Sequence, residues 1–149
     1  MRLEGAVLRR GFWLYAWEVT TPEGDSLVYV GRTGDNSSPN AQSPFNRMGQ
    51  HLGFAAASSM LRTHLTNRGI DPIDCTFRMV SHGPILEEVD NMEDHKVRRD
   101  QVAAMERDLA ADLANAGYTV LNKVRSHASL DEDAYAEVRA AFAEEFSGL

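Results

Sequence analysis

Two segments rich in aromatic and β-branched residues, joined by a short turn, constrain the fold of this chain most strongly. They lie at 12–20 and 27–30, and the residues Pro-Glu-Gly-Asp at 22–25 between them are strong turn formers. Gly31 closes the second segment. Runs of this length and composition on either side of a turn are typical of paired β-strands. The pattern therefore predicts a β-hairpin near the N-terminus, around which the rest of the chain packs.

The segments that follow favour helices, with one further strand among them. Residues 75–81 alternate, with Cys75, Phe77 and Met79 on one face, which indicates a third strand. The other expected elements are an irregular segment at 33–44, a helix from 43 or 44 to about 53, a helix at 55–67, a long helix that ends near 117, an apolar segment at 118–121 and an amphipathic helix at 131–146.

This order of elements predicts the α+β class, with one domain over 1–149. We expect a small three-stranded, mainly antiparallel sheet flanked by helices, with an extra C-terminal helix. The core of the domain is expected at about 12–125, and the C-terminal helix at about 131–146.

The composition is that of a globular protein and excludes several classes. With 149 residues and 43% hydrophobic side chains, the chain is long enough to bury one core. Cys75 is the only cysteine, which excludes an intrachain disulfide and a cysteine-rich zinc site and suits a reducing compartment. No run of about 18 apolar residues occurs in the sequence. We therefore expect a cytoplasmic protein without a membrane partner.

The net charge of −7 is unusual for a protein that binds nucleic acid, because phosphate binding generally needs a basic surface. The charge is unevenly distributed along the chain. Residues 1–52 carry five basic and five acidic side chains, residues 53–100 carry six and eight, and residues 101–149 carry four and nine. Most of the acidic excess thus lies in the C-terminal third, which leaves the first two thirds available for contact with phosphate.

The predicted hairpin carries two tyrosines and a glycine that are candidates for a site. Tyr15 lies on the first strand and Tyr29 on the second, so their phenols can point at one spot. Gly31, at the end of the second strand, lets a backbone or a ligand approach closely. The alternative is that both tyrosines are half-buried packing residues, which is common for aromatic residues in strands.

Arg47 and His51 are four residues apart in a predicted helix, which places them on the same helical face. A guanidinium offers a fixed fork of donors that suits phosphate, and an imidazole can transfer a proton near neutral pH. The alternative is an exposed arginine next to a surface histidine with no chemical role.

Two further polar residues lie close to apolar patterns. Glu106 falls inside the apolar stripe of the long helix, since Val102, Leu109 and Leu113 lie at i−4, i+3 and i+7. A carboxylate in such a stripe is costly unless it is paired or bound to a cation, although it can also reach solvent at the edge of the stripe. Asn122 follows an apolar segment, where its amide suits either a site or an ordinary turn.

In their order along the chain, these residues resemble the GIY-YIG endonuclease family. The matching segments are Trp13-Leu14-Tyr15, Tyr29-Val30-Gly31-Arg32-Thr33, Arg47-Met48-Gly49-Gln50-His51, Glu106 and Leu121-Asn122. The resemblance covers about 12–125. The first motif reads Trp-Leu-Tyr where the family has Gly-Ile-Tyr, and Trp17 offers an alternative alignment for Tyr15.

The resemblance implies a metal-dependent endonuclease that hydrolyses phosphodiester bonds in nucleic acid, with DNA favoured over RNA. Glu106 would bind a divalent metal, Mg²⁺ or Mn²⁺, because hard cations prefer oxygen ligands. Arg47 would neutralise charge on the phosphoryl oxygens. Gly31 and Arg32 would contact the substrate.

The same resemblance gives roles to four more residues. Tyr29 would position or activate the attacking water, and Tyr15 would brace it. His51 would pass the proton on, and Asn122 would hold the site together by hydrogen bonds. Which of the two tyrosines acts as a base stays open.

Two other functions are compatible with the sequence. One is a nucleic-acid-binding module that keeps the fold without catalysis. The other is an interaction domain whose acidic C-terminal helix pairs with a partner or a second copy. The apolar residues of that helix suit either an interface or the chain's own core. They are Tyr135, Val138, Phe142 and Phe146. A stand-alone enzyme and a homodimer are both compatible with the sequence, the latter because a domain this small can rely on dimerisation for double-strand cuts.

Overall fold

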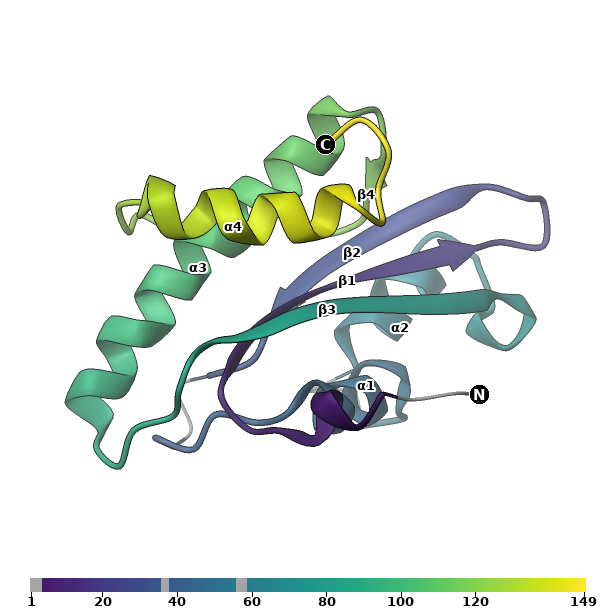
Figure 1. Ribbon diagram of the computed structural model, residues 1–149. Coiled ribbons are helices and arrows are strands. Elements are labelled where there is room, and N and C mark those ends of the chain that lie inside the picture. The colour runs from purple at the N-terminus through teal and green to yellow at the C-terminus, as the bar shows by residue number, and fades with distance from the viewer. Residues whose placement is uncertain (1–3, 36–37, 56–58) are drawn as a thin grey trace.

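The computed structural model describes residues 4–35, 38–55 and 59–149, and it has a four-stranded sheet with helices on both faces (Figure 1). The α+β class is therefore confirmed. The elements, in order, are η1 (Gly5–Leu8), β1 (Phe12–Thr20), β2 (Ser26–Arg32), α1 (Pro44–Leu52), α2 (Met60–Thr66), η2 (Pro72–Asp74), β3 (Thr76–Leu86), α3 (Met92–Asn115), β4 (Thr119–Val120) and α4 (Glu132–Ala143).

The sheet has the order β3-β1-β2-β4, with the predicted hairpin at its centre. Strand β1 pairs antiparallel with both β2 and β3. Strand β4 pairs parallel with β2 through two residue pairs, Leu27 with Thr119 and Val28 with Val120. The prediction of three strands was wrong, because a two-residue strand has no periodicity of its own and exists only through its pairing with β2.

Strand β3 is longer than the predicted strand at 75–81. It begins at Thr76 and continues through Gly83 and Pro84 to Leu86, five residues beyond the expected end at Ser81. The extension pairs Leu86 with Phe12, across an irregularity in register on β1. The start of β1 thus gains a hydrogen-bonding partner, which explains why the strand passes through two residues that usually interrupt strands.

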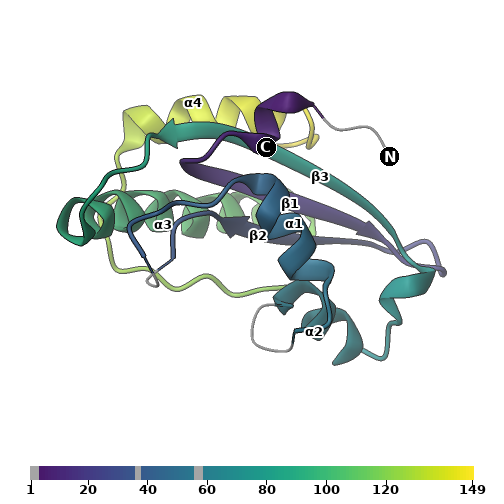
Figure 2. The same ribbon diagram turned by 90° about the horizontal axis from the view of Figure 1, so that it is seen from below.

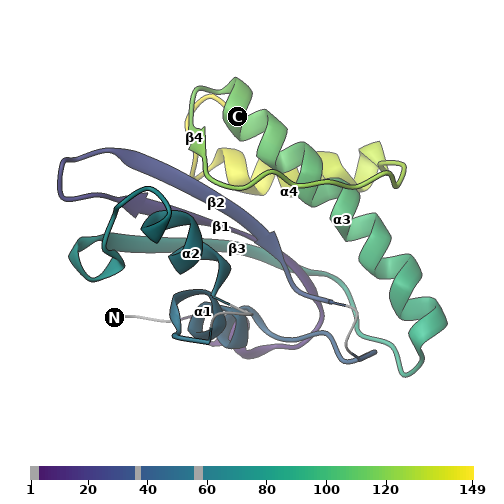
Figure 3. The same ribbon diagram turned by 180° about the vertical axis from the view of Figure 1, so that it is seen from behind.

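Alternating side chains of the hairpin point to opposite faces of the sheet, and both faces are covered. Leu14 and Val30 belong to the core between the sheet and the helices α3 and α4. Tyr15, Trp17 and Tyr29 belong to a second core on the side of α1 and α2. Figures 1 and 3 show the two pairs of helices on opposite sides of the strands. The central strand β1 is therefore buried on both sides.

The N-terminal ends of helices α1, α3 and α4 are capped by short polar side chains. Ser43 accepts a hydrogen bond from the amide of Asn46 at the start of α1. Asn91 and Asp131 do the same for α3 and α4. Helix α2 starts at Met60, later than the predicted start at 55, and residues 56–58 of that prediction lie outside the described residues.

Helix α4 packs against α3 and the sheet with its apolar side (Figure 2). Tyr135, Val138, Phe142 and Phe146 are all buried, with exposed fractions of 7% or less. The stripe therefore serves the chain's own core, and it does not offer these side chains to a partner. In the described part of the chain, none of the helices has the length and apolarity needed to cross a bilayer.

Candidate active site

The polar candidates gather where strand β2 ends. On its outer edge β2 pairs with β4 only at Leu27 and Val28. Among the described residues, no strand pairs with that edge beyond Val28. Helix α1 approaches this end of the strand from one face of the sheet and α3 from the other (Figure 2). The last residues of β2, Gly31 and Arg32, are thus accessible to side chains from both helices.

On the α1 face, Tyr15, Arg47 and His51 form one hydrogen-bonded group. The hydroxyl of Tyr15 lies 2.6 Å from Nε2 of His51, and Nε of Arg47 donates to it over 3.3 Å. The same hydroxyl donates to the carbonyl of Arg32 over 3.3 Å. All three contacts are satisfied together when Nε2 of His51 carries the proton and donates to the phenol oxygen. Arg47 and His51, which the sequence places on one helical face, therefore both contact Tyr15, the first candidate tyrosine.

His51 is fully buried and uncharged. Burial, together with the nearby charge of Arg47, lowers its pKa to about 3. Its Nδ1 is buried and has no hydrogen-bond partner within the described residues. In the tautomer above, Nδ1 keeps its lone pair and is a hydrogen-bond acceptor without a partner in the described part of the chain. The alternative of a solvent-exposed surface histidine does not hold.

Tyr29 lies beside the same imidazole. Its ring meets that of His51 edge-on, with centroids 5.0 Å apart, and that of His64 on α2 at 5.7 Å. Burial and the neighbouring Tyr15 raise the pKa of the Tyr29 hydroxyl above its ordinary value. This hydroxyl makes no hydrogen bond to any residue that the structure describes. It is therefore a neutral group with its hydrogen-bonding capacity unused.

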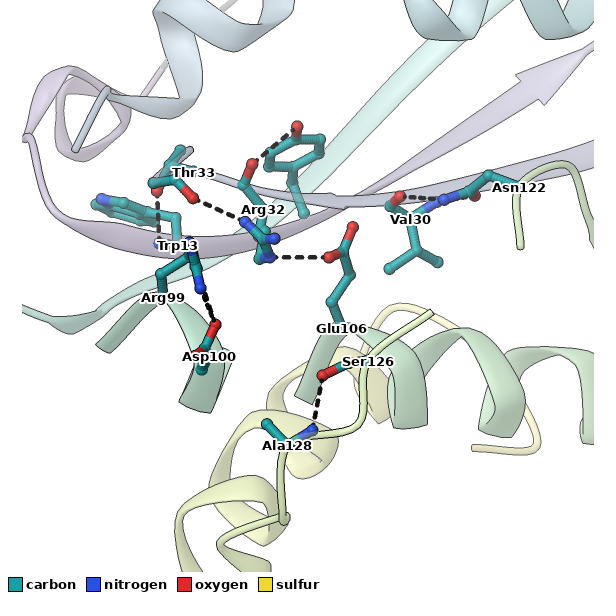
Figure 4. A network of polar contacts seen from close by, with 12 residues as sticks. Trp13, Val30, Arg32, Thr33, Arg99, Asp100, Glu106, Asn122, Ser126 and Ala128 are labelled. Carbon is teal, nitrogen blue, oxygen red and sulfur yellow. Dashed lines mark hydrogen bonds and ion pairs between the residues drawn. The ribbon is translucent and has the colours of Figure 1, made fainter. Parts of the chain in front are cut away.

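On the α3 face, Arg32 and Glu106 form an ion pair. Nε of Arg32 lies 3.0 Å from Oε2 of Glu106, and their side chains are 24% and 12% exposed. Figure 4 shows Glu106 projecting from α3 toward the end of β2, beside Arg32. Burial raises the pKa of the Glu106 carboxyl to about 7, although Arg32 and Arg47 act in the opposite direction. The ion pair therefore offsets only part of the cost of burying this carboxylate.

The two faces are electrostatically one site. Burial is the main cause of the raised pKa of Tyr15, Tyr29 and Glu106; the charge of Glu106 adds to the rise for both tyrosines, and the charge of Arg47 opposes the rise for Glu106. Such effects require charges that are close and poorly screened. Glu106 thus acts on the α1 group across the end of β2, although its helix packs on the opposite face of the sheet.

Asn122 binds the backbone of strand β2 next to the residues of the site. Its Oδ1 accepts from the amide of Val30 over 3.0 Å, and its Nδ2 donates to the Val30 carbonyl over 2.8 Å (Figure 4). The side chain thereby continues the pairing of β4 with β2 by one more residue. Both ends of the Asn122 amide are engaged with Val30, between Tyr29 and Gly31. Its contribution is to hold the strand that carries these residues.

Gly31 makes room for Tyr15. The two residues are partners in the β1–β2 ladder, and a Cβ on Gly31 would lie 2.6 Å from Oη of Tyr15. The space next to this glycine is thus filled by the tyrosine ring, and contact of Gly31 with a substrate stays a prediction. Trp17, the alternative to Tyr15 in the alignment, packs edge-on against Phe77. Tyr15 is therefore the one that reaches His51.

Two buried polar residues near the site were missed in the sequence. Thr33 is fully buried, donates through Oγ1 to the Gly11 carbonyl over 2.6 Å and accepts from the Trp13 amide. His95 on α3 is also fully buried, and its ring nitrogens lie 3.0 Å and 2.7 Å from the carbonyls of Pro39 and Asp35. Both anchor the segment after β2. A polar residue directly after a predicted strand was the signal for Thr33, whereas His95 gave none.

The chemistry of the donors allows one carboxylate for a metal ion. Within the described residues, no group of three or more His, Cys, Asp or Glu side chains is placed to hold a metal. Glu106 is nevertheless a buried carboxylate whose pKa is raised, so a cation beside it would be stabilising. Mg²⁺ is commonly held by one or two carboxylates together with water and substrate phosphate. The residues present fit that kind of ion.

Comparison with known proteins adds no relative. No family model matches the chain, and no match was found among curated proteins or solved structures.

Proposed function

We propose that this protein is a metal-dependent endonuclease of the GIY-YIG type, which hydrolyses phosphodiester bonds in nucleic acid, with DNA as the favoured substrate. The observation that carries the proposal is the meeting of Tyr15, Arg47 and His51 with Arg32 and Glu106 at the end of β2. These residues come from distant parts of the sequence and from both sides of the sheet. A phosphate needs cationic donors and a metal needs a carboxylate, and both kinds of group are gathered here.

The distribution of charge supports a nucleic-acid substrate. From 36 to 70 the sequence contains three arginines and no acidic residue. This stretch includes α1 and α2, which cover the face of the sheet that carries Tyr15 and Tyr29. Much of the acidic excess lies on α3 and α4, on the other face. The overall charge of −7 is thus compatible with a basic approach to the site.

The arginines bind and orient the substrate phosphate in this proposal. Arg47 is fixed by its bonds to Tyr15 and to Oε1 of Gln50, the latter at 2.8 Å. Arg32 is fixed by Glu106 and by a bond from Nη1 to the Gly34 carbonyl at 2.7 Å. Because each guanidinium carries five donors, both retain N–H groups for phosphoryl oxygens. Their fixed geometry favours the charge that develops there in the transition state.

The tyrosines and His51 handle the attacking water. The Tyr29 hydroxyl has no partner within the described residues and orients a water molecule by hydrogen bonding. Its raised pKa keeps it neutral, so it acts as a positioning group. Tyr15 links His51 to Arg47, and Nδ1 of His51 keeps a lone pair that can accept a proton. An anionic phosphate in the site raises the basicity of that imidazole.

Glu106 holds the metal ion through its carboxylate. When bound, the ion neutralises charge on the phosphate and stabilises the leaving oxygen. Because the ionised form of Glu106 is disfavoured by burial, ion and carboxylate stabilise each other. A homodimer and a cytoplasmic location stay predictions that accompany this proposal.

A second candidate is nucleic-acid binding without cleavage. The ion pair between Arg32 and Glu106 favours it, since a carboxylate that already has a cationic partner needs no metal. The two functions differ in one readily measured property. Only the enzyme converts supercoiled DNA into nicked or linear forms.

The experiment incubates purified protein with supercoiled plasmid in Mg²⁺, in Mn²⁺ and in EDTA. The proposal predicts nicking with either metal and none in EDTA. Arg47→Ala should slow nicking by at least about tenfold, the loss of roughly 1.4 kcal/mol of transition-state stabilisation. Arg139→Ala, an exposed arginine on α4 that pairs with Asp112 on the other face of the sheet, is the matched control and should cleave like the wild type. Plasmid that stays supercoiled with both metals, while still bound by the protein, contradicts the enzyme and supports the binding module.

A further inference from the structure

A polar pocket of about 380 Å³ lies next to the candidate site, on the α3 side of strand β2. Its polar lining includes Arg32, Arg99, Asp100, Arg125 and His127. Arg32 is shared, because it lines the pocket and also pairs with Glu106 at 3.0 Å. Figure 4 shows Arg99, Asp100, Ser126 and Ala128 around this pair. The pocket is therefore continuous with the site and separate from the Tyr15 group on the α1 face.

The lining of this pocket is cationic in a protein that is acidic overall. Three arginines and one carboxylate, Asp100, line it. Arg99 pairs with Asp100 and Arg32 with Glu106 beside the pocket, which leaves the charge of Arg125 unbalanced among these residues. Arg125 and His127 are exposed, and neither makes a hydrogen bond or ion pair within the described residues. A guanidinium and an imidazole without a partner among these residues, at one concave surface, offer N–H donors to an anionic ligand.

The segment that carries Arg125 and His127 is held in place from behind. It runs back from β4 across α3 (Figure 3). Nη1 of Arg107 donates to the carbonyls of Ser126 and Ala128, over 3.0 Å in each case. Oγ of Ser126 accepts from the Ala128 amide over 3.3 Å. Because its carbonyls are bound to α3, the segment presents its side chains to the pocket without a large ordering cost on binding.

We propose that this pocket binds a backbone phosphate of the nucleic acid, next to the phosphate that is cut. The inference rests on the proposed function and deepens it, since Arg32 joins the two positions and successive phosphates follow one another along a strand. Arg125 supplies the main contact, because a guanidinium can bind two phosphate oxygens at once. The pocket thereby fixes the register of the strand, and Glu106, Arg32 and the Tyr15 group carry the chemistry.

The test measures binding without cleavage. A short fluorescein-labelled DNA duplex is titrated with protein in EDTA, and its anisotropy gives the Kd at several salt concentrations. Arg125→Ala should weaken binding by about fivefold or more and lower the slope of log K against log salt by about one. Lys123→Ala is the matched control. It removes one positive charge two residues away, from a side chain that lines a different pocket, and should change the Kd by less than about twofold.

A charge-preserving variant, a folding check and a competition experiment complete the test. Arg125→Lys keeps the charge and should retain part of the affinity, and circular dichroism with thermal unfolding checks that each variant is folded. Inorganic phosphate is then added as a competitor at constant ionic strength. If the pocket is a general phosphate site, phosphate displaces DNA from the wild type but not from Arg125→Ala. If the pocket needs a nucleic-acid strand, phosphate displaces DNA from neither protein. Both results support phosphate recognition.

Equal losses of DNA affinity in Arg125→Ala and Lys123→Ala would overturn the proposed phosphate site. A wild-type protein that fails to bind the duplex would overturn it too. The failure of the pocket is distinguishable from the failure of the proposed function. Metal-dependent cleavage that persists in Arg125→Ala at saturating DNA would leave the nuclease standing, whatever the binding result.

Discussion

Gly31 faces Tyr15 across the β1–β2 ladder, and the tyrosine ring occupies the space in which a side chain at 31 would lie. This close approach directs the Tyr15 hydroxyl toward His51 and Arg47. A local property of one strand, the absence of a Cβ, thus determines the position of the polar group on the neighbouring helix. The site depends on a packing relationship as much as on its functional groups.

Gly31→Ala tests that relationship. The added methyl would clash with the Tyr15 ring, which has no room to move in a closely packed core. We expect a loss of about 1–3 kcal/mol in the free energy of unfolding and a slower nicking rate, measured by urea denaturation and plasmid assay. Gly49→Ala is the control, since an added Cβ there meets nothing within 4 Å and an alanine favours the helix. A Gly31→Ala protein as stable and active as the wild type would contradict this role.

The Tyr15 hydroxyl should be energetically coupled to His51. Tyr15→Phe removes its contacts to His51 and Arg47 and leaves buried polar atoms unpaired, which costs about 1–3 kcal/mol. A double-mutant cycle with His51→Leu should give a coupling free energy of about 1 kcal/mol or more. Tyr135→Phe also removes a tyrosine hydrogen bond, to Asp112 at 2.8 Å, but away from the site. Tyr135→Phe should lower stability and leave the nicking rate unchanged. Additive effects of Tyr15→Phe and His51→Leu on stability would refute the coupling.

The raised pKa of Glu106 makes stability depend on pH in a definite direction. The folded protein holds the Glu106 proton up to pH about 7, whereas the unfolded chain releases it near 4.5. The stabilising contribution is therefore fully present below pH 4.5 and is lost as the pH rises through 7. Relative to Glu106→Gln, the wild type should lose up to about 3 kcal/mol of unfolding free energy between pH 4.5 and 8.

Urea denaturation at each pH measures this difference, and Glu93→Gln in the exposed first turn of the same helix is the control. The comparison between variants is needed because His51 acts in the opposite direction. Its lowered pKa of about 3 makes stability rise with pH up to about 6.5. Mg²⁺ added at pH 8 should stabilise the wild type but not Glu106→Gln. Parallel pH profiles for the wild type and Glu106→Gln would show that this carboxyl titrates normally.

Asn122 should matter for stability through both ends of its amide. Asn122→Asp keeps the acceptor for the Val30 amide but places an oxygen against the Val30 carbonyl, so we expect a loss of about 1–3 kcal/mol. Asn122→Ala should cost a similar amount. Asn115→Ala, at the exposed end of α3, should stay within about 0.5 kcal/mol. Thermal unfolding separates these outcomes, and an Asn122→Asp protein with the wild-type Tm would exclude the support of β2 by this residue.

The sequence was informative where local chemistry determines the structure. The hairpin and the apolar stripe of the C-terminal helix follow from residue types and spacing within a short window. The placement of Glu106 within the apolar stripe of α3 was also readable, and its side chain is only 12% exposed. In these cases the local pattern and the tertiary packing agree.

The remaining features depend on partners far away in the chain. Strand β4 is defined by its pairing with β2, and the extension of β3 by the pairing of Leu86 with Phe12. The ion pair of Arg32 with Glu106 joins residues that no periodicity connects. The filling of the space at Gly31 by Tyr15 likewise required the register of the hairpin. Such contacts are properties of the folded sheet, which a one-dimensional pattern does not contain.

The central claim is that Glu106 and the α1 group form one metal-dependent active site. Its most direct test is the single-turnover rate of DNA cleavage in Mg²⁺ by Glu106→Gln, compared with Glu93→Gln, the same chemical change elsewhere on α3. We predict that Glu106→Gln still folds and binds DNA but cleaves at least about a hundredfold more slowly, whereas Glu93→Gln cleaves like the wild type. Cleavage by Glu106→Gln at the wild-type rate would contradict the account.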